Sequence, residues 1–262
     1  MTERFLSGRD RLRPWLTVAA IAGAFGVNAL SNVRPLNGQN IGQLSNTLFA
    51  NVLITPANYA FAIWGVIYLG LIGFSIYQFL PPANQHPRIA RISYAIVVAS
   101  LAQAIWVYLF LARQFVGSML AMTVILLGLI VAYLQLEPRR SPIWQERWLL
   151  QLPLSLYLGW ISVATVVNGA IALYSLNWSG WGLDPVIWTA IMLGVTGGLG
   201  GLVLWRRQDV AFAGVFVWAW IAIAVKRSEI LLIAEIAIGL AVIVLGAIVV
   251  ISYRQRRTPR TE

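Results

Sequence analysis

The sequence predicts an all-α polytopic membrane protein with about eight transmembrane helices, and three observations support this. Of its 262 residues, 59% are hydrophobic and only 11% are charged, against about 25% charged in soluble domains. Several uncharged stretches reach the roughly 20 residues that a helix needs to cross a bilayer. The charged residues lie in short clusters between these stretches, as they do in the loops of membrane proteins.

The apolar stretches follow one another with polar links between them. The first follows an arginine-rich start, but it is long for a secretory signal and no small-residue cleavage site ends it, so we expect a retained helix. The second opens at Thr55 and Pro56, which suits helix entry from a loop. The seventh is short for a span. The predicted spans cover residues 14–33, 55–77, 92–112, 114–136, 148–174, 185–205, 210–225 and 230–253.

The cations divide unevenly between the two sides of the membrane. With eight spans and the N-terminus inside, 15 of the 19 cations lie inside and only Arg34, Arg113, Lys226 and Arg227 lie outside. If the seventh stretch did not span, the division would be 13 to 6. Inside loops are enriched in Lys and Arg. We therefore predict a cell-membrane, multi-pass protein whose N- and C-termini are both cytoplasmic.

Several classes of function are disfavoured. The chain has no cysteine, which excludes disulfides, thiolate catalysis and cysteine metal sites. No His, Asp or Glu cluster has metal-ligand spacing, and no catalytic triad or nucleotide loop appears in a usable context. The net charge of +10 follows membrane topology and does not indicate nucleic acid. We predict no metal, no cofactor, no catalytic residue and no nucleic-acid partner, with the lipid bilayer as the surroundings.

Three predicted spans carry aromatic residues at spacings of three and four, which places them on one stripe of each helix. If the helices pack on these stripes, a flat apolar ligand would stack on the rings while amide groups orient it. The alternative is that the rings pack helix against helix and the amides bond between helices. The predicted ligand-binding residues are Asn28, Phe61, Trp64, Tyr68, Gln103, Trp106, Phe110, Tyr157, Trp160, Ala164 and Asn168.

Other residues near or within the spans have simpler interpretations. Tryptophans near span ends are typical anchors at the membrane interface; they are Trp144, Trp148, Trp178, Trp181 and Trp205. Glu235 is the only acid well inside a predicted span, so a functional role is the first hypothesis. It would serve proton or substrate coupling, or else pair with Lys226 or Arg227.

The second and fifth spans contain sequence motifs that resemble those of the TspO/MBR family, the tryptophan-rich sensory or translocator proteins. The stretches are FAIWGVIY and YLGWISVATVVN. In the fifth span the family spacing W-x-S-x-A-x-x-x-N is kept, with a Tyr three residues before the Trp. In the second span Trp64 and Tyr68 keep W-x-x-x-Y. In the third, Trp106 and Phe110 keep the spacing of the family's N-x-x-W-S-x-L-F-F run, although Gln103 replaces its Asn.

The resemblance covers about residues 12–175 and implies a five-helix bundle in residues 1–176, followed by a three-helix membrane extension with a basic cytoplasmic tail in residues 177–262. The whole chain resembles long, eight-helix members of the family. The family implies a cavity between the first, second, third and fifth helices, closed by the loop between the first two. Its ligands include tetrapyrroles, sterols and drug-like binders, and its members often form homodimers.

Together these observations predict a non-enzymatic membrane protein that binds a flat hydrophobic ligand, a porphyrin or other tetrapyrrole or a sterol-like molecule. Its role would be sensing, as a receptor, or transport. One alternative is a secondary transporter of another small solute, with the last three helices as the gate and Glu235 as the coupling group. Another is an enzyme that modifies porphyrins, because some family members are described as promoting porphyrin breakdown.

Overall fold

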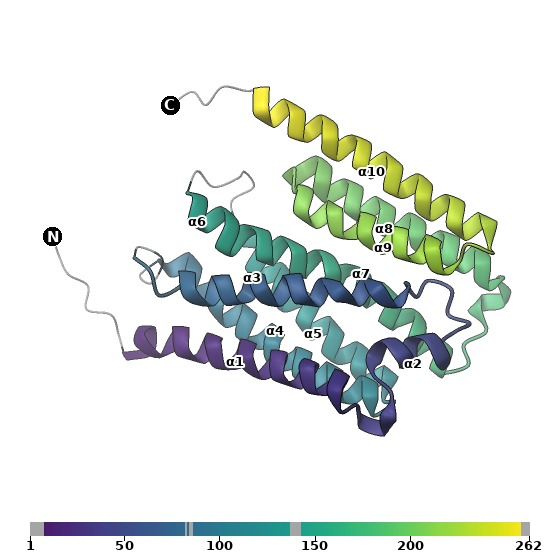
Figure 1. Cartoon of the computed structure of the whole chain (residues 1–262), viewed down its shortest axis with the longest axis horizontal. Coiled ribbons are helices and arrows are strands. Elements are labelled where there is room, and N and C mark those ends of the chain that lie inside the picture. The colour runs from purple at the N-terminus through teal and green to yellow at the C-terminus, as the bar shows by residue number, and fades with distance from the viewer. Residues whose placement is uncertain (1–7, 82, 84–85, 137–142, 258–262) are drawn as a thin grey trace. The chain divides into compact units, whose positions relative to one another are not determined.

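The computed structural model describes the chain except for residues 1–7, 82, 84–85, 137–142 and 258–262. Within these described residues every regular element is a helix, which confirms the all-α prediction (Figure 1). The long helices are α1 (Gly8–Val33), α3 (Ile63–Tyr77), α4 (Pro87–Leu111), α5 (Phe115–Leu134), α7 (Leu152–Ser175), α8 (Pro185–Arg207), α9 (Val210–Lys226) and α10 (Leu231–Arg257).

These eight helices correspond to the eight predicted spans. Among the described residues, seven helical stretches are long and apolar enough to cross a membrane, and α9, with 17 residues, is the shorter apolar helix. The short elements between them are η1 (Leu36–Gly38), α2 (Ile41–Thr47), η2 (Asn58–Ala62), α6 (Trp144–Glu146), η4 (Arg147–Gln151) and η5 (Gly180–Gly182).

Several helix starts differ from the prediction. α1 begins at Gly8 instead of residue 14, and α4 begins at Pro87 instead of residue 92. Residues 55–57 are not helical, and a 3-10 turn, η2, leads into α3 at Ile63. The helical stretch that contains α7 begins at Trp144 instead of residue 148 and passes through the π-helical turn η4. In that turn the Leu152 N–H donates to Arg147 O, five residues back. Pro153 follows directly and has no N–H to donate, which favours an irregular turn at this point.

The described chain forms two compact units that do not follow its order. The first unit comprises Met1–Ile41 and Ile63–Ile161, and the second comprises Gly42–Ala62 and Ser162–Glu262. In the first, α1 packs on α3 and α4, α4 packs on α5, and η4 packs on α3. In the second, α8, α9 and α10 pack on one another and η2 packs on α9. The predicted domain boundary after residue 176 stays a prediction.

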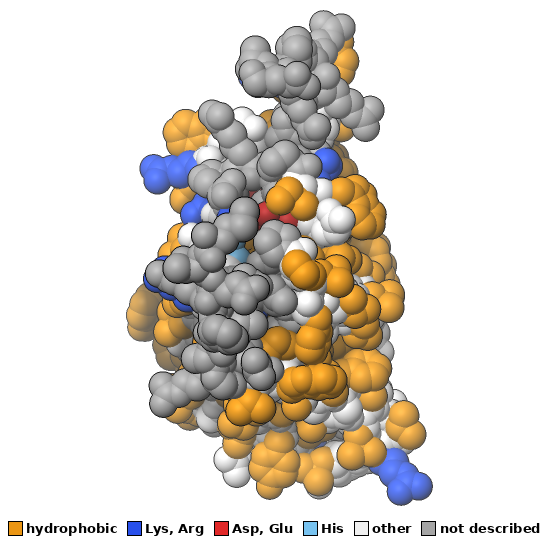
Figure 2. All heavy atoms as spheres, turned by 90° about the vertical axis from the view of Figure 1, so that its left-hand side faces the viewer, with side chains coloured by type: hydrophobic (Ala, Val, Ile, Leu, Met, Phe, Trp, Pro, Cys, Tyr) orange, Lys and Arg blue, Asp and Glu red, His pale blue; other side chains and the backbone are white. Residues whose placement is uncertain are grey.

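Hydrophobic side chains cover much of the described surface. Figure 2 shows them over most of the atoms that are coloured in that view, with Lys and Arg at scattered points. Trp144, Trp148, Trp181 and Trp205 are all exposed, as residues that anchor helices at a membrane interface would be. Soluble monomers rarely expose so much apolar surface to water, so this surface fits a lipid environment.

Close helix packing in the first unit depends on glycine. A Cβ built on Gly70 of α3 would lie 2.8 Å from Pro153 Cβ and 3.3 Å from Pro153 Cα. Proline is rigid, so it cannot move aside as a flexible side chain would. On the same helix, a Cβ at Gly65 would meet no atom within 4 Å.

Gly70→Ala should therefore destabilise the protein by about 1–3 kcal/mol, because the added methyl group overpacks the contact with Pro153. Gly65→Ala is the matched control on α3 and should leave stability within about 1 kcal/mol of the wild type. Thermal unfolding of both variants in a neutral detergent tests this. Equal melting temperatures for the two variants would contradict the close approach at Gly70.

Candidate functional site

An aromatic cluster joins three helices of the first unit. Trp64 and Tyr68 of α3 stack on each other with ring centroids 5.6 Å apart. Trp64 meets Tyr157 of α7 edge-on at 5.8 Å, and Tyr68 meets Phe25 of α1 edge-on at 5.0 Å. The Tyr68 hydroxyl also donates to Ala24 O at 3.3 Å. The predicted stripe of α3 therefore points at other helices of its own unit.

The aromatic stripe of α4 is also buried. Trp106 and Phe110 pack on each other at 5.4 Å, and Phe110 meets Phe115 of α5 edge-on at 5.4 Å. Trp160 of α7 and Asn28 of α1 are buried as well. All of the predicted site residues in the first unit are thus buried. Burial is expected both for residues that line a ligand pocket and for residues that pack helices together.

Gln103 of α4 has a side-chain amide without hydrogen bonds. The residue is 1% exposed, and neither Nε2 nor Oε1 has a partner among the described residues. Gln78 provides a contrast within the same unit, because it is 0% exposed and both of its amide atoms are bonded. Its Nε2 donates to Pro14 O at 3.3 Å, and its Oε1 accepts from the Ser93 hydroxyl at 3.2 Å.

A buried polar group without a partner costs about 1–3 kcal/mol, so buried amides are nearly always bonded. Gln103 departs from this rule on the same helix face as Trp106 and Phe110, three and seven residues later. Its donor and its acceptor remain available to a polar atom of a ligand. This is the strongest chemical signal among the predicted site residues.

Three predicted site residues belong to the second unit. Phe61 lies in η2 and is half-buried, Ala164 is half-buried in the second part of α7, and Asn168 is buried on the same helix. The structure brings the other eight predicted residues into the first unit. The complete eleven-residue pocket stays a prediction.

Comparison with known proteins gives one match. The sequence model of the TSPO-like protein family matches residues 14–250. The chain belongs to this family. Comparison with curated proteins and with solved structures gives no significant match. The family match also covers α8, α9 and α10 almost to the end of α10, whereas the motifs in the sequence reach only about residue 175.

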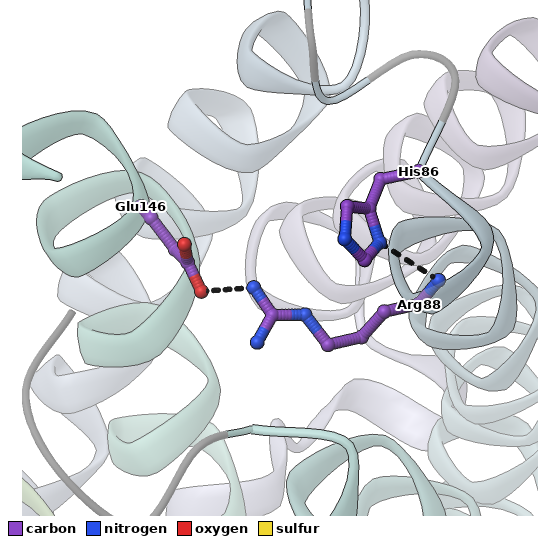
Figure 3. A network of polar contacts seen from close by, with 3 residues as sticks. All are labelled: His86, Arg88 and Glu146. Atoms are coloured by element: carbon purple, nitrogen blue, oxygen red, sulfur yellow. Dashed lines mark hydrogen bonds and ion pairs between the residues drawn. The ribbon is translucent and has the colours of Figure 1, made fainter.

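Sequence reasoning missed a buried ion pair of this TSPO-like protein. The predicted spans end at residue 136 and begin again at residue 148, which puts Glu146 in a polar link, but the helical stretch begins at Trp144 and Glu146 is only 5% exposed. It pairs with the Nη2 of Arg88, and Figure 3 shows the Arg88 side chain extending from α4 toward it. His86 accepts from the Arg88 N–H at 3.2 Å and so caps α4. Across the described residues, no group of three or more His, Cys, Asp or Glu side chains is arranged to hold a metal ion.

The predicted pairing of Glu235 is wrong. Glu235 is exposed on α10 and forms no ion pair with any described residue. Lys226 and Arg227 donate to neutral oxygens instead, namely the Thr55 hydroxyl and backbone carbonyls of residues 52–56. The N–H groups of Lys226 and Arg227 that were expected to bond to Glu235 therefore donate to these oxygens.

The two buried glutamines lead to a paired prediction. Gln103→Met should raise stability by about 1–3 kcal/mol, because it removes an amide that has no partner. Gln78→Met should lower stability by a similar amount, because it removes the buried hydrogen bonds of Gln78 to Pro14 O and from the Ser93 hydroxyl. Thermal unfolding of the ligand-free protein in detergent measures both. Destabilisation by both variants would mean that the Gln103 amide has a partner.

The ion pair leads to a second prediction. Arg88→Met should cost about 3–5 kcal/mol, because it leaves the Glu146 carboxylate buried without its guanidinium. The double variant Arg88→Met/Glu146→Met should be more stable than Arg88→Met alone, because it also removes the buried carboxylate that has lost the Arg88 guanidinium. Melting temperatures of the single and double variants provide the test, and a double variant less stable than Arg88→Met would contradict it.

Proposed function

We propose that this TSPO-like protein binds a flat hydrophobic ligand, most suitably a tetrapyrrole, among the aromatic residues of α1, α3, α4 and α7. The observation that carries the proposal is the buried amide of Gln103, which has no hydrogen-bond partner among the described residues and lies on the aromatic face of α4. A site that only packed helices together would gain nothing from an amide in this position. A ligand that bonds to the amide would remove the cost of burying it.

The chemistry of a tetrapyrrole suits these residues. Its conjugated plane can stack on indole and phenol rings, and Trp64 and Tyr157, whose ring centroids lie 5.8 Å apart, supply one ring of each kind. Its pyrrole nitrogens include both hydrogen-bond donors and acceptors, so either atom of the Gln103 amide can serve. Sterol-like molecules offer an apolar body with one hydroxyl, and they are the second ligand class that these residues would accept.

The biological role in this proposal is sensing or transport without catalysis. We place the protein in the cell membrane with both termini in the cytoplasm, because that orientation puts most cations inside. We also propose a homodimer, in keeping with the family resemblance. The predicted five-helix unit of residues 1–176 would carry the ligand, and residues 177–262 would form the extension.

A second candidate role is coupled transport of a small solute. The observation that favours it is Glu235, an acid exposed on the apolar helix α10 without an ion-pair partner among the described residues. An ionisable group in such a place is a functional hypothesis by default. Solute flux into proteoliposomes that depends on a proton gradient and disappears in Glu235→Gln would support this role over simple ligand binding.

Binding of protoporphyrin IX to the purified protein tests the main proposal. The double variant Trp64→Phe/Trp160→Phe should weaken binding at least tenfold, because it removes two indole surfaces at once. Gln103→Met should also weaken binding by about tenfold, which corresponds to the loss of about one hydrogen bond in a buried site. Absorbance titration of the porphyrin in detergent measures both.

Trp205→Phe is the matched control, because Trp205 is 75% exposed at the end of α8. It should leave porphyrin affinity unchanged. If the double tryptophan variant and Gln103→Met both keep wild-type affinity, the site assignment is wrong.

A further inference from the structure

In the second unit, Arg227 directly after α9 binds the segment that precedes η2. Its Nε donates to Leu53 O at 3.0 Å, and its Nη2 donates to Val52 O at 3.0 Å. Nη2 also donates to the Thr55 hydroxyl at 3.1 Å. The guanidinium is therefore held in one orientation by three neutral oxygen atoms, with its second terminal nitrogen left over.

Lys226 is held beside it through the same hydroxyl. Its Nζ donates to Thr55 Oγ1 at 2.9 Å and, more weakly, to Pro56 O at 3.4 Å. Because one oxygen accepts from both cations, Lys226 Nζ and Arg227 Nη2 lie no more than about 6 Å apart. The Thr55 hydroxyl donates in turn to Val52 O at 2.8 Å, which uses its own proton.

No carboxylate balances these two charges among the described residues. Every acceptor that Lys226 and Arg227 reach is a neutral carbonyl or hydroxyl oxygen, and Glu229 and Glu235 are exposed without an ion pair to either. Lys226 follows the apolar run 210–225. Holding two like charges together in this way is unfavourable unless an anion joins them.

The pair retains hydrogen-bond donors for such an anion. An ammonium has three N–H donors and a guanidinium has five, and the bonds above use two and three of them. Both residues are half-exposed, so the remaining donors are accessible from outside. Two fixed cations with free N–H groups match the several oxygens of a phosphate.

We propose that Lys226 and Arg227 form a binding site for a phosphate oxyanion, carried by the head group of an anionic phospholipid or present as free phosphate. The position of the pair at the end of an apolar helix is the level at which head groups lie. The site is separate from the tetrapyrrole proposal, because it uses none of the residues assigned to that ligand. Binding of a phosphate would neutralise two positive charges for which the described part of the chain supplies no carboxylate.

Thermal unfolding of the full chain in neutral detergent tests the site, because a ligand that binds only the folded state raises the melting temperature. Three probes are added separately: phosphatidylglycerol, phosphatidylcholine and inorganic phosphate. We expect stabilisation by phosphatidylglycerol and none by phosphatidylcholine. Stabilisation by inorganic phosphate as well assigns the site to free phosphate, and its absence assigns the site to the lipid head group. No difference between the two lipids, together with no effect of inorganic phosphate, would overturn the proposal.

Variants that change the charge of the pair distinguish phosphate binding from a purely structural role, in which Lys226 and Arg227 only hold residues 52–56 in place. Lys226→Gln keeps a donor for Thr55 but loses the charge, and it should weaken the response to the stabilising probe at least tenfold in apparent affinity. Arg227→Gln should do the same, whereas Arg227→Lys should retain part of the response because it keeps the charge. Arg34→Gln removes one exposed cation elsewhere and is the matched control, with no expected change.

Arg227→Gln also removes bonds to residues 52–55, so it is the variant at greatest risk of misfolding. If it fails to fold, Lys226→Gln and Arg227→Lys decide the question. A wild-type response in Lys226→Gln would show that the pair only fastens the segment, and the proposed site would then be wrong.

Discussion

A polar group placed in hydrocarbon must find its partner within the protein, and this constraint governs the structure. Helices satisfy it for the backbone. Several buried hydroxyl side chains satisfy it by bonding to a carbonyl one turn earlier, as Thr17 does to Arg13 O at 3.0 Å and Ser31 does to Asn28 O at 2.7 Å. Longer side chains satisfy it between helices, as Gln78 does with Pro14 O. Against this background a buried amide without a partner, such as that of Gln103, is a departure that calls for a functional explanation.

The same constraint explains what the sequence could predict. Span length and the 3.6-residue period are local properties, so the eight helices and the buried faces of Trp64, Trp106 and Tyr157 follow directly from the residue pattern. Helix starts were less accurate, because a turn such as η4 depends on how a proline is accommodated. Long-range pairs could not be predicted at all. Arg88 and Glu146 are 58 positions apart, and Lys226 and Thr55 are 171 apart, so no local pattern encodes either contact.

The last three helices are tied to an early part of the chain. Within the second unit, the Ala57 N–H donates to Ala222 O at 3.0 Å, and Trp218 Nε1 donates to Ala60 O at 3.1 Å. Tyr59 also meets Trp218 edge-on at 5.3 Å. These contacts bind the segment that leads into α3 to the face of α9. The family match through residue 250 is consistent with this, because a segment from the N-terminal half has its hydrogen bonds completed by the C-terminal helices.

Among the described residues, the Gln103 amide and the Lys226 and Arg227 pair keep hydrogen-bonding capacity that the fold does not use, and they differ in character. The Gln103 amide is neutral, buried and on the same face of α4 as Trp106 and Phe110, so it suits an uncharged polar atom on a flat apolar molecule. The Lys226 and Arg227 pair is charged, half-exposed and placed at the end of an apolar helix, so it suits an anion at the membrane surface. The buried amide and the two adjacent positive charges each cost free energy in the folded protein. A cost of this kind is best explained by a ligand that removes it, and the two environments select ligands of different classes.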